Sequence, residues 1–148
     1  MTNQAAWQNP DDTQLKNMLS TAKNIAVVGC SPKPERSSYQ IASYLIQHGY
    51  HVFPVHPRAT SILGQTGYPS LADIPEPIDI VDVFRKPEFT PDIAKQAASI
   101  HAKTLWLQQG IQHPQTYEIA QQHNMHCVMD LCIAVMHRLL LLKHTATT

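Results

Sequence analysis

Five short apolar runs, separated by segments with helical spacing, constrain the fold of this chain most strongly. Short unbroken runs of this kind are typical of strands covered on both faces. Strands that alternate with helices predict a parallel sheet with crossover helices packed against it. The chain is therefore predicted to form a doubly wound α/β domain of about five strands with helices on both faces. The predicted strands are residues 25–29, 51–55, 78–84, 103–107 and 126–129.

The segments between the runs carry helix signals. Asp11 or Asp12 is predicted to cap a first helix that ends near Asn24, and Ser37 or Ser38 a second helix. Residues 63–77 are rich in glycine and proline and predict an ordered loop with at most one helical turn. The remaining predicted helices run from near Pro91 toward His101, from Pro114 to His123, and from a cap at Asp130 through 131–142.

Composition limits the setting in which the chain works. Its 148 residues fit one domain, 1–148, with a core over about 15–137. Eleven basic and eleven acidic side chains balance, so no nucleic-acid partner is expected. Three cysteines argue against a disulfide framework, and the N-terminus lacks the pattern of a signal peptide. The apolar stretch 131–142 is too short to span a membrane, so we expect a cytoplasmic protein without a membrane partner.

Ligands of doubly wound sheets bind outside the carboxyl ends of the strands, where the strand order reverses. For the order 3-2-1-4-5, that point lies between the first and fourth strands, lined by residues 30–38 and 108–112. The first loop leads into a helix N-terminus, which favours a phosphate. Gly29 permits a tight turn there, and the loop side chains supply donors and positive charge: Ser31, Lys33, Arg36, Ser37 and Ser38. An ordinary loop with a serine cap is the alternative.

The end of the second predicted strand argues against NAD. An NAD site places an acidic residue there, whereas this chain has His56, Pro57 and Arg58. Histidine and arginine suit a phosphorylated ribose, which indicates NADP or coenzyme A. The alternative is that both side chains are merely solvated.

The third and fourth strands end in further candidate residues. Phe84 can cover an adenine, and Arg85 can bind a phosphate. Alternatively, Phe84 belongs to the core and Arg85 pairs with Asp82 or Glu88. Gln108 and Gln109, followed by Gly110, either bond a ligand or begin a loop.

Several ordered blocks between about Leu15 and about His137 resemble the small CoA-binding proteins, the YccU-like family. These blocks include IAVVGCSPKPERSSYQIASYLIQHGYHVFPVHP, IDIVDVFRKPE, AKTLWLQQGI and VMDLC. That family in turn resembles the CoA-binding N-terminal domain of the succinyl-CoA synthetase α subunit. The resemblance implies a Rossmann-like fold that holds coenzyme A or an acyl-CoA.

The resemblance also implies roles for individual residues. Gly29, Ser31, Lys33 and Ser38 would serve the phosphate loop, together with Cys30 within it. Pro54, Val55, His56 and Pro57 would border the adenosine, and Phe84 and Arg85 would form the far wall. Gln109 and Gly110 fall in a Gln-Gly block, and Asp130 and Cys132 in an Asp-x-Cys block. The chain departs from the family in having Cys30 for alanine, His56 for asparagine and Leu131 for arginine.

The expected function is a non-catalytic module that binds coenzyme A, because no catalytic set can be assigned from spacing. An NADP-linked or CoA-dependent enzyme is the second interpretation. The third is a scaffold without a ligand, which pairs into a homodimer through the leucine-rich final helix. Redox chemistry at Cys30 or Cys132 is a minor hypothesis. No metal site is expected, because the cysteines and histidines near residue 127 match no zinc spacing.

Overall fold

A five-stranded parallel sheet forms the centre of the protein, described here from a computed structural model for residues 7–58 and 60–142. The spatial order is β2-β1-β5-β6-β7. Ile25 of β1 lies between Val52 of β2 and Ile80 of β5, so the apolar runs form adjacent rungs. The predicted Rossmann-like α/β fold is confirmed. The strand bounds are β1 Asn24–Val28, β2 His51–Val55, β5 Ile80–Val83, β6 Thr104–Leu107 and β7 His126–Val128.

The order of the strands differs from the prediction. The first, second and third long strands are β1, β2 and β5, so the observed order is 2-1-3-4-5 in place of 3-2-1-4-5. The order therefore reverses between β1 and β5, and the crevice lies between the first and third strands. A sequence of apolar runs does not reveal on which side of β1 the third strand pairs, because both sides offer the same backbone donors and acceptors.

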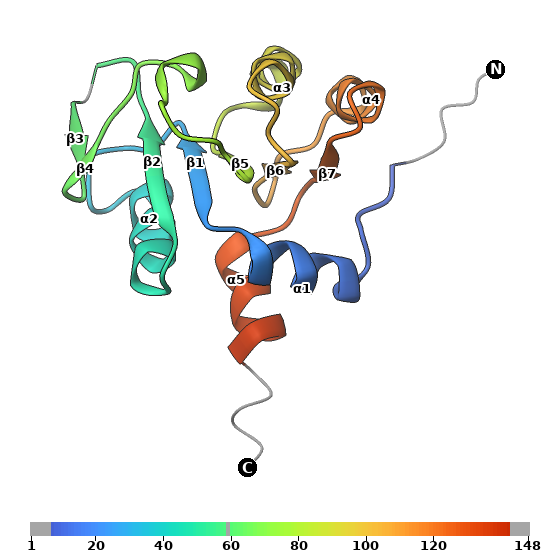
Figure 1. Ribbon diagram of the computed structural model, residues 1–148, viewed down its shortest axis with the longest axis horizontal. Helices are drawn as coiled ribbons and strands as arrows, with labels where there is room; N and C mark the ends of the chain where they lie inside the picture. Colours follow the sequence, from blue (N-terminus) through green and yellow to red (C-terminus); the bar gives the residue numbers. More distant parts are fainter. Residues whose placement is uncertain (1–6, 59, 143–148) are drawn as a thin grey trace.

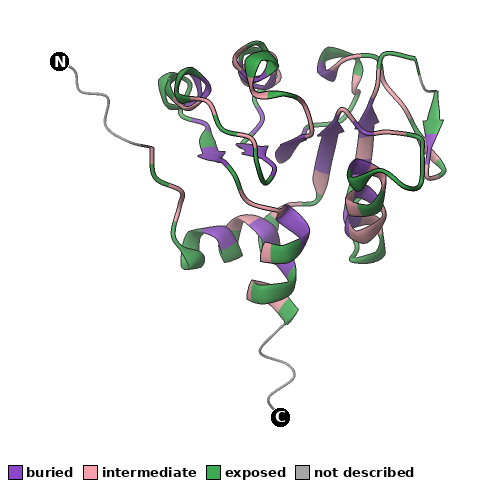
Figure 2. Ribbon diagram, turned by 180° about the vertical axis from the view of Figure 1, so that it is seen from behind, coloured by how far each residue is buried: buried purple, intermediate pink, exposed green. Residues whose placement is uncertain are grey.

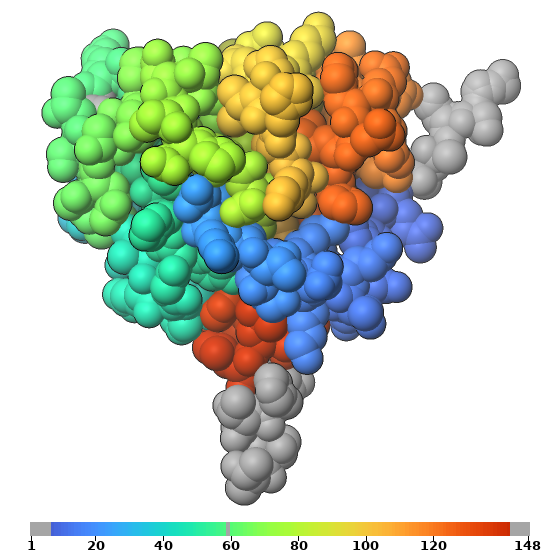
Figure 3. All heavy atoms as spheres, viewed as in Figure 1, coloured from blue at the N-terminus to red at the C-terminus, as the bar shows by residue number. Residues whose placement is uncertain are grey.

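Helices cover both faces of the sheet (Figure 1). Helices α3 (Thr90–Ser99) and α4 (Pro114–Gln122) lie side by side on one face. Helices α1 (Asp12–Thr21), α2 (Ser37–Gln47) and α5 (Ile133–His137) pack on the other face. Figure 3 shows α3 and α4 together at one end of the molecule, with α5 against α1 at the opposite end. The strands between these layers are almost wholly buried (Figure 2).

Helix starts agree with the sequence in part. Asp11 caps α1 through a capping box with Gln14, as the sequence predicted, although α1 ends at Thr21 and Asn24 already belongs to β1. The prediction that Ser37 or Ser38 caps α2 is wrong, because Arg36 holds the N-cap position without a side-chain hydrogen bond. Both serines lie within the first turn of α2.

Two further predictions need correction. Asp130 does not cap the last helix: Cys132 is the N-cap of α5, and residues 138–142 continue as a π-helical segment, η3 (Arg138–Leu142). The loop 63–77 contains the predicted helical turn, η1 (Leu71–Asp73). It also contributes to a small hairpin, β3 (Ser61–Ile62) and β4 (Gln65–Thr66), that the sequence did not indicate. A short 3-10 turn, η2 (Pro87–Phe89), precedes α3.

Candidate ligand-binding groove

Gly29 occupies the switch point between β1 and β5. Its φ is +83°, and its N–H donates a hydrogen bond to the carbonyl of Val55. A Cβ added there would lie 2.6 Å from the carbonyl oxygen of Phe84 and 3.1 Å from Cδ of Arg85. Glycine is therefore required for two reasons: the left-handed backbone and the close approach of the chain that follows β5.

The loop after Gly29 is held by its own serines. The N–H of Ser31 donates to Oγ of Ser38 at 2.9 Å, and the N–H of Lys33 donates to Oγ of Ser31 at 3.0 Å. These bonds direct the loop into the first turn of α2. Because Arg36 provides no side-chain cap, the N-terminal end of α2 is open to an external anion.

Two adjoining depressions meet at Gly29 and together form what we call the groove. One, of about 510 Å³, lies over the loop and the start of α2, and the other, of about 330 Å³, lies between the strand ends and α3. Eleven of the residues singled out from the sequence line the groove: Gly29, Ser31, Lys33, Arg36, Ser37, Ser38, Val55, His56, Pro57, Phe84 and Arg85. Its cationic side chains, Lys33, Arg36 and Arg85, come from two separate segments of the chain.

Four of the candidate residues do not line the groove. Cys30 is fully buried in the layer between the sheet and α2, and Pro54 is buried within β2. Gln109 and Gly110 are exposed beyond β6, where the N–H of Gly110 donates to the Asp130 carboxylate at 2.7 Å. The Gln-Gly and Asp-x-Cys blocks therefore meet each other.

Gln108 and Asp130 have structural roles in this arrangement. The buried Gln108 accepts a hydrogen bond through Oε1 from the N–H of Ile133 at 3.1 Å, which satisfies the start of α5. This role of Gln108 is neither of the two that the sequence suggested, a ligand contact or the start of a loop, because its side chain joins two segments of the chain. Asp130 performs a similar function through its bond to Gly110.

Arg85 does not form either of the ion pairs considered from the sequence. Its guanidinium carbon lies 4.5 Å from the centroid of the Phe89 ring, a cation–π contact that holds the side chain over the smaller depression. Phe84 is half-buried and lines the larger depression, while it also packs against the core layer. Phe84 thus packs against the core, as one alternative held, and its role toward an adenine stays a prediction.

Asp82 is the residue that sequence reasoning missed. It lies in β5 between Val27 and Trp106, and its side chain is fully buried. Neither carboxylate oxygen has a hydrogen-bond partner among the described residues. Desolvation by burial raises the pKa of this carboxyl well above its usual value. The available signal was the position of this acid between two valines, Val81 and Val83.

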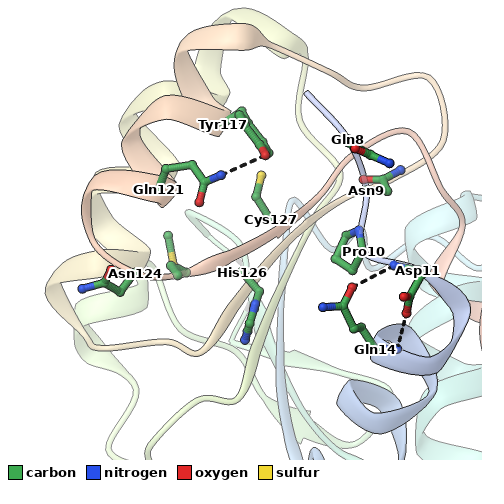
Figure 4. A pocket seen from close by; sticks show the side chains of 11 residues that line it. Gln8, Asn9, Pro10, Asp11, Gln14, Tyr117, Gln121, Asn124, His126 and Cys127 are labelled. Atoms are coloured by element: carbon green, nitrogen blue, oxygen red, sulfur yellow. Dashed lines mark hydrogen bonds between the residues drawn. The ribbon is translucent and has the colours of Figure 1, made fainter. Parts of the chain in front are cut away.

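A third cavity, of about 570 Å³, lies between the N-terminal segment, α4 and β7 (Figure 4). Strand β7 forms the edge of the sheet opposite β2. The polar groups of the cavity largely bond to one another. Asn9 bonds both the N–H and the carbonyl of Met129 at 2.8 Å, and Gln121 donates to the Tyr117 hydroxyl. Asp11 and Gln14 form the capping box of α1. These bonds attach the N-terminal segment to the sheet edge.

The cysteines offer little reactive chemistry. Burial raises the pKa of the Cys30 and Cys127 thiols to about 12, so both remain protonated near neutral pH. The redox hypothesis for Cys30 therefore loses its physical basis, whereas Cys132 is half-exposed. Among residues 7–58 and 60–142, no three His, Cys, Asp or Glu side chains gather in a way that could hold a metal ion.

The fold and the groove define a Rossmann-like domain with a cationic site at the switch point of its sheet. A family model described as CoA binding domain matches residues 23–138. The chain belongs to this family. The resemblance noted from the sequence is thereby confirmed.

Two relatives of similar length match over nearly the whole chain. The chain is 38% identical over 130 residues to the uncharacterized protein YneT of Bacillus subtilis. The aligned region covers 88% of this chain and 96% of YneT. A hypothetical protein from Pyrococcus horikoshii is 35% identical, with a TM-score of 0.88 and coverage of 95% of this chain and 99% of that one.

Part of a larger enzyme is also similar. Acetate–CoA ligase [ADP-forming] II of Archaeoglobus fulgidus is 31% identical over 78 residues, which cover 51% of this chain and 12% of the ligase. The matched region is therefore a small fraction of that enzyme. In the described part of this chain, no helix has the length and apolar character needed to cross a membrane.

Proposed function

We propose that this protein binds coenzyme A, free or acylated, in the groove at the switch point, as a binding module without chemistry of its own. Membership of the CoA binding domain family supports the class of ligand. The single observation that carries the proposal is the groove itself, where Lys33 and Arg36 lie beside the open N-terminus of α2, and Arg85 lines the adjoining depression together with Asp92. A polyanionic ligand matches that charge.

The pyrophosphate is assigned to the larger depression. The N-terminal end of a helix carries a partial positive charge and free N–H groups, which stabilise a bound phosphate. Lys33 and Arg36 add two full positive charges on the loop that leads into this helix. The hydroxyl of Ser38 already accepts the Ser31 N–H, so its own proton remains available to donate to the ligand.

The adenosine is assigned to the ends of β2 and β5. His56 and Phe84 line the larger depression, and Pro57 and Arg85 line the smaller one, so the four residues border a continuous surface. Coenzyme A carries a phosphate on its ribose, and His56 with the neighbouring Arg58 suits that group better than the free hydroxyl of NAD. The half-buried Phe84 offers a face for the adenine.

Calorimetric titration with coenzyme A tests the proposal, with NAD and NADP as comparison ligands. We expect coenzyme A to bind and NAD to give no heat of binding. Lys33→Ala and Arg85→Ala should each weaken binding by roughly tenfold, because each removes a charge-assisted contact worth about 1.5 kcal/mol or more. The effect should diminish at high salt.

Lys16→Ala is the matched control, since Lys16 is an exposed cation on α1 and does not line the groove. This variant should bind coenzyme A as the parent protein does. A folded parent protein that does not bind coenzyme A would overturn the proposal. Binding of NADP alone would replace it with an NADP site in the same groove.

A further inference from the structure

The buried carboxyl of Asp82 is the feature that the proposed function leaves unexplained. An unpartnered polar group in the core costs stability, and a side chain of similar volume without charge would avoid that cost. Asp82 has zero exposure, and neither of its oxygens is hydrogen-bonded within the described chain. A buried residue that lowers the stability of the fold and lies beside a ligand site is a candidate for a functional role.

Asp82 lies close beneath the phosphate side of the groove. It pairs in register with Val27, two residues before Gly29, while Phe84 and Arg85 follow directly after the end of its strand, β5. Standard strand spacings place its Cα about 8 Å from that of Gly29. Cys30, the residue between Gly29 and Ser31, is buried in the same layer as Val27 and Trp106, the strand neighbours of Asp82, so the carboxyl faces the layer under the loop.

Within residues 7–58 and 60–142, no cation forms an ion pair with Asp82 that could balance an ionised carboxylate. Its neighbours on this face of the sheet include Val27, Ile80 and Trp106, and α1, α2 and α5 cover the same layer. The titratable side chains in or beside this layer are Cys30, Tyr39, Tyr44, His48, Tyr50 and His137, with Cys132 at the start of α5. The exposed Arg138 places its guanidinium over the Tyr44 ring, 5.6 Å from the ring centroid.

We propose that Asp82 is protonated whenever the groove is filled and thereby makes coenzyme A binding depend on pH, an inference that rests on the proposed function. An ionised carboxylate at this place repels the phosphates of the ligand through a medium of low dielectric constant. Two unit charges about 10 Å apart, at an effective dielectric constant of about 20, change an equilibrium constant by roughly tenfold. By linkage, the bound ligand also makes Asp82 harder to ionise. Asp82 thus acts on the phosphates of the ligand through electrostatic repulsion and does not contact the ligand, so it is a positioning residue.

Affinity measured against pH for the parent protein and Asp82→Asn tests the proposal. Calorimetric titrations with coenzyme A would span about pH 6 to pH 9, which lies above the ordinary aspartate pKa of about 4, because burial raises the pKa of this carboxyl. The ligand's own phosphate and thiol also titrate there, but they do so equally with both proteins. The ratio of the two dissociation constants therefore isolates Asp82.

We expect the parent protein to lose affinity relative to Asp82→Asn as pH rises, by on the order of tenfold across the range. Asp12→Asn is the matched control, because Asp12 is an exposed carboxylate in the first turn of α1. Its ratio to the parent protein should not change with pH. A ratio that is equally flat for Asp82→Asn would overturn the inference and leave the proposed function intact.

A second measurement on the parent protein keeps the test decisive if Asp82→Asn fails to fold. The carbon-13 shift of the Asp82 carboxyl can be titrated without ligand and with saturating coenzyme A. We expect ionisation at a higher pH in the complex, and an unchanged titration would overturn the inference. If coenzyme A does not bind at any pH, the proposed function fails separately. In that case, the titration without ligand still tests the inference: ionisation of the Asp82 carboxyl at the ordinary aspartate pKa of about 4 would overturn it.

Discussion

Single residues decide the geometry of the groove, and Gly29 is the most demanding of them. Its positive φ and the 2.6 Å approach of the Phe84 carbonyl act together. Gly49 has a comparable φ of +95°, but an added Cβ would meet nothing within 4 Å. A comparison of alanine variants at the two positions therefore separates the effect of backbone strain, present at both, from that of steric overlap, present only at Gly29.

We expect Gly49→Ala to lower the free energy of unfolding by about 1 kcal/mol, through strain alone. Gly29→Ala should lower it by about 2 to 4 kcal/mol, because overlap with the backbone after β5 adds to the strain. Urea denaturation of both variants provides the measurement. Equal losses in the two variants would show that the approach of Phe84 is not restrictive.

The residues of the groove were largely identifiable from the sequence because strand ends and loop residues can be located along a chain. Asp82 was not, because its importance comes from what surrounds it. The run Ile78–Phe84 places an acid inside a strand, but the sequence offered Arg85 as its partner. Side chains alternate along a strand, which puts residues 82 and 85 on different faces, and Arg85 instead contacts Phe89.

At the scale of elements, a cluster of rings joins α5 to α2. Nδ1 of His137 lies 2.8 Å from the Tyr44 hydroxyl, and its ring centroid is 5.0 Å from that of His48. Burial, followed by the proximity of His48, lowers the pKa of His137. The folded protein therefore favours the neutral imidazole more than the unfolded chain does.

This shift predicts how stability changes with pH. The contribution of His137 is fully present above the unfolded pKa of about 6.5 and is lost as pH falls through that value toward the lower folded pKa. Urea unfolding at about pH 7.5 and pH 5 should show this loss in the parent protein and a smaller loss in His137→Gln. His51→Gln, which changes an exposed histidine of β2, should keep the loss unchanged. An unaltered loss in His137→Gln would contradict the prediction.

Element starts show where local sequence is sufficient. The capping box of Asp11 and Gln14 needs only four consecutive residues, and the sequence predicted its acid correctly. The start of α5 depends on Gln108, which lies 25 residues away in sequence. Asp130, the expected cap, bonds Gly110 instead and adopts a φ of +62°. A cap supplied by a distant segment leaves no pattern near the helix.

At the scale of the whole molecule, ligand binding should stabilise the fold. The groove draws on the ends of β1, β2 and β5, so a bound ligand contacts segments that separate on unfolding. Coenzyme A at about 100 times its dissociation constant should add about 2.7 kcal/mol to the free energy of unfolding. For a chain of this size, that raises Tm by roughly 5 to 10 °C.

Thermal denaturation with and without coenzyme A measures this shift. Lys33→Ala should show a smaller rise at the same ligand concentration, because its groove is filled less completely. NAD should leave Tm unchanged. A Tm that does not respond to coenzyme A would contradict both the stabilisation and the proposed site.

Self-association stays a separate prediction, to be tested by measuring the mass of the protein in solution. It rests on α5 and η3, which leave Val135, Leu139 and Leu142 exposed.

The sequence by itself determined the fold class, the positions of the five long strands and the loop that follows β1. Those features follow from local periodicity and from turn residues, which act over a few neighbouring positions. Only the tertiary structure decided that β5 pairs beside β1, because the choice of neighbour depends on packing across the whole sheet. That choice brings Phe84 and Arg85 against Gly29 and encloses Asp82 below the groove. The charges that surround the site therefore depend on the strand order of the folded sheet and cannot be read from any single segment of the chain.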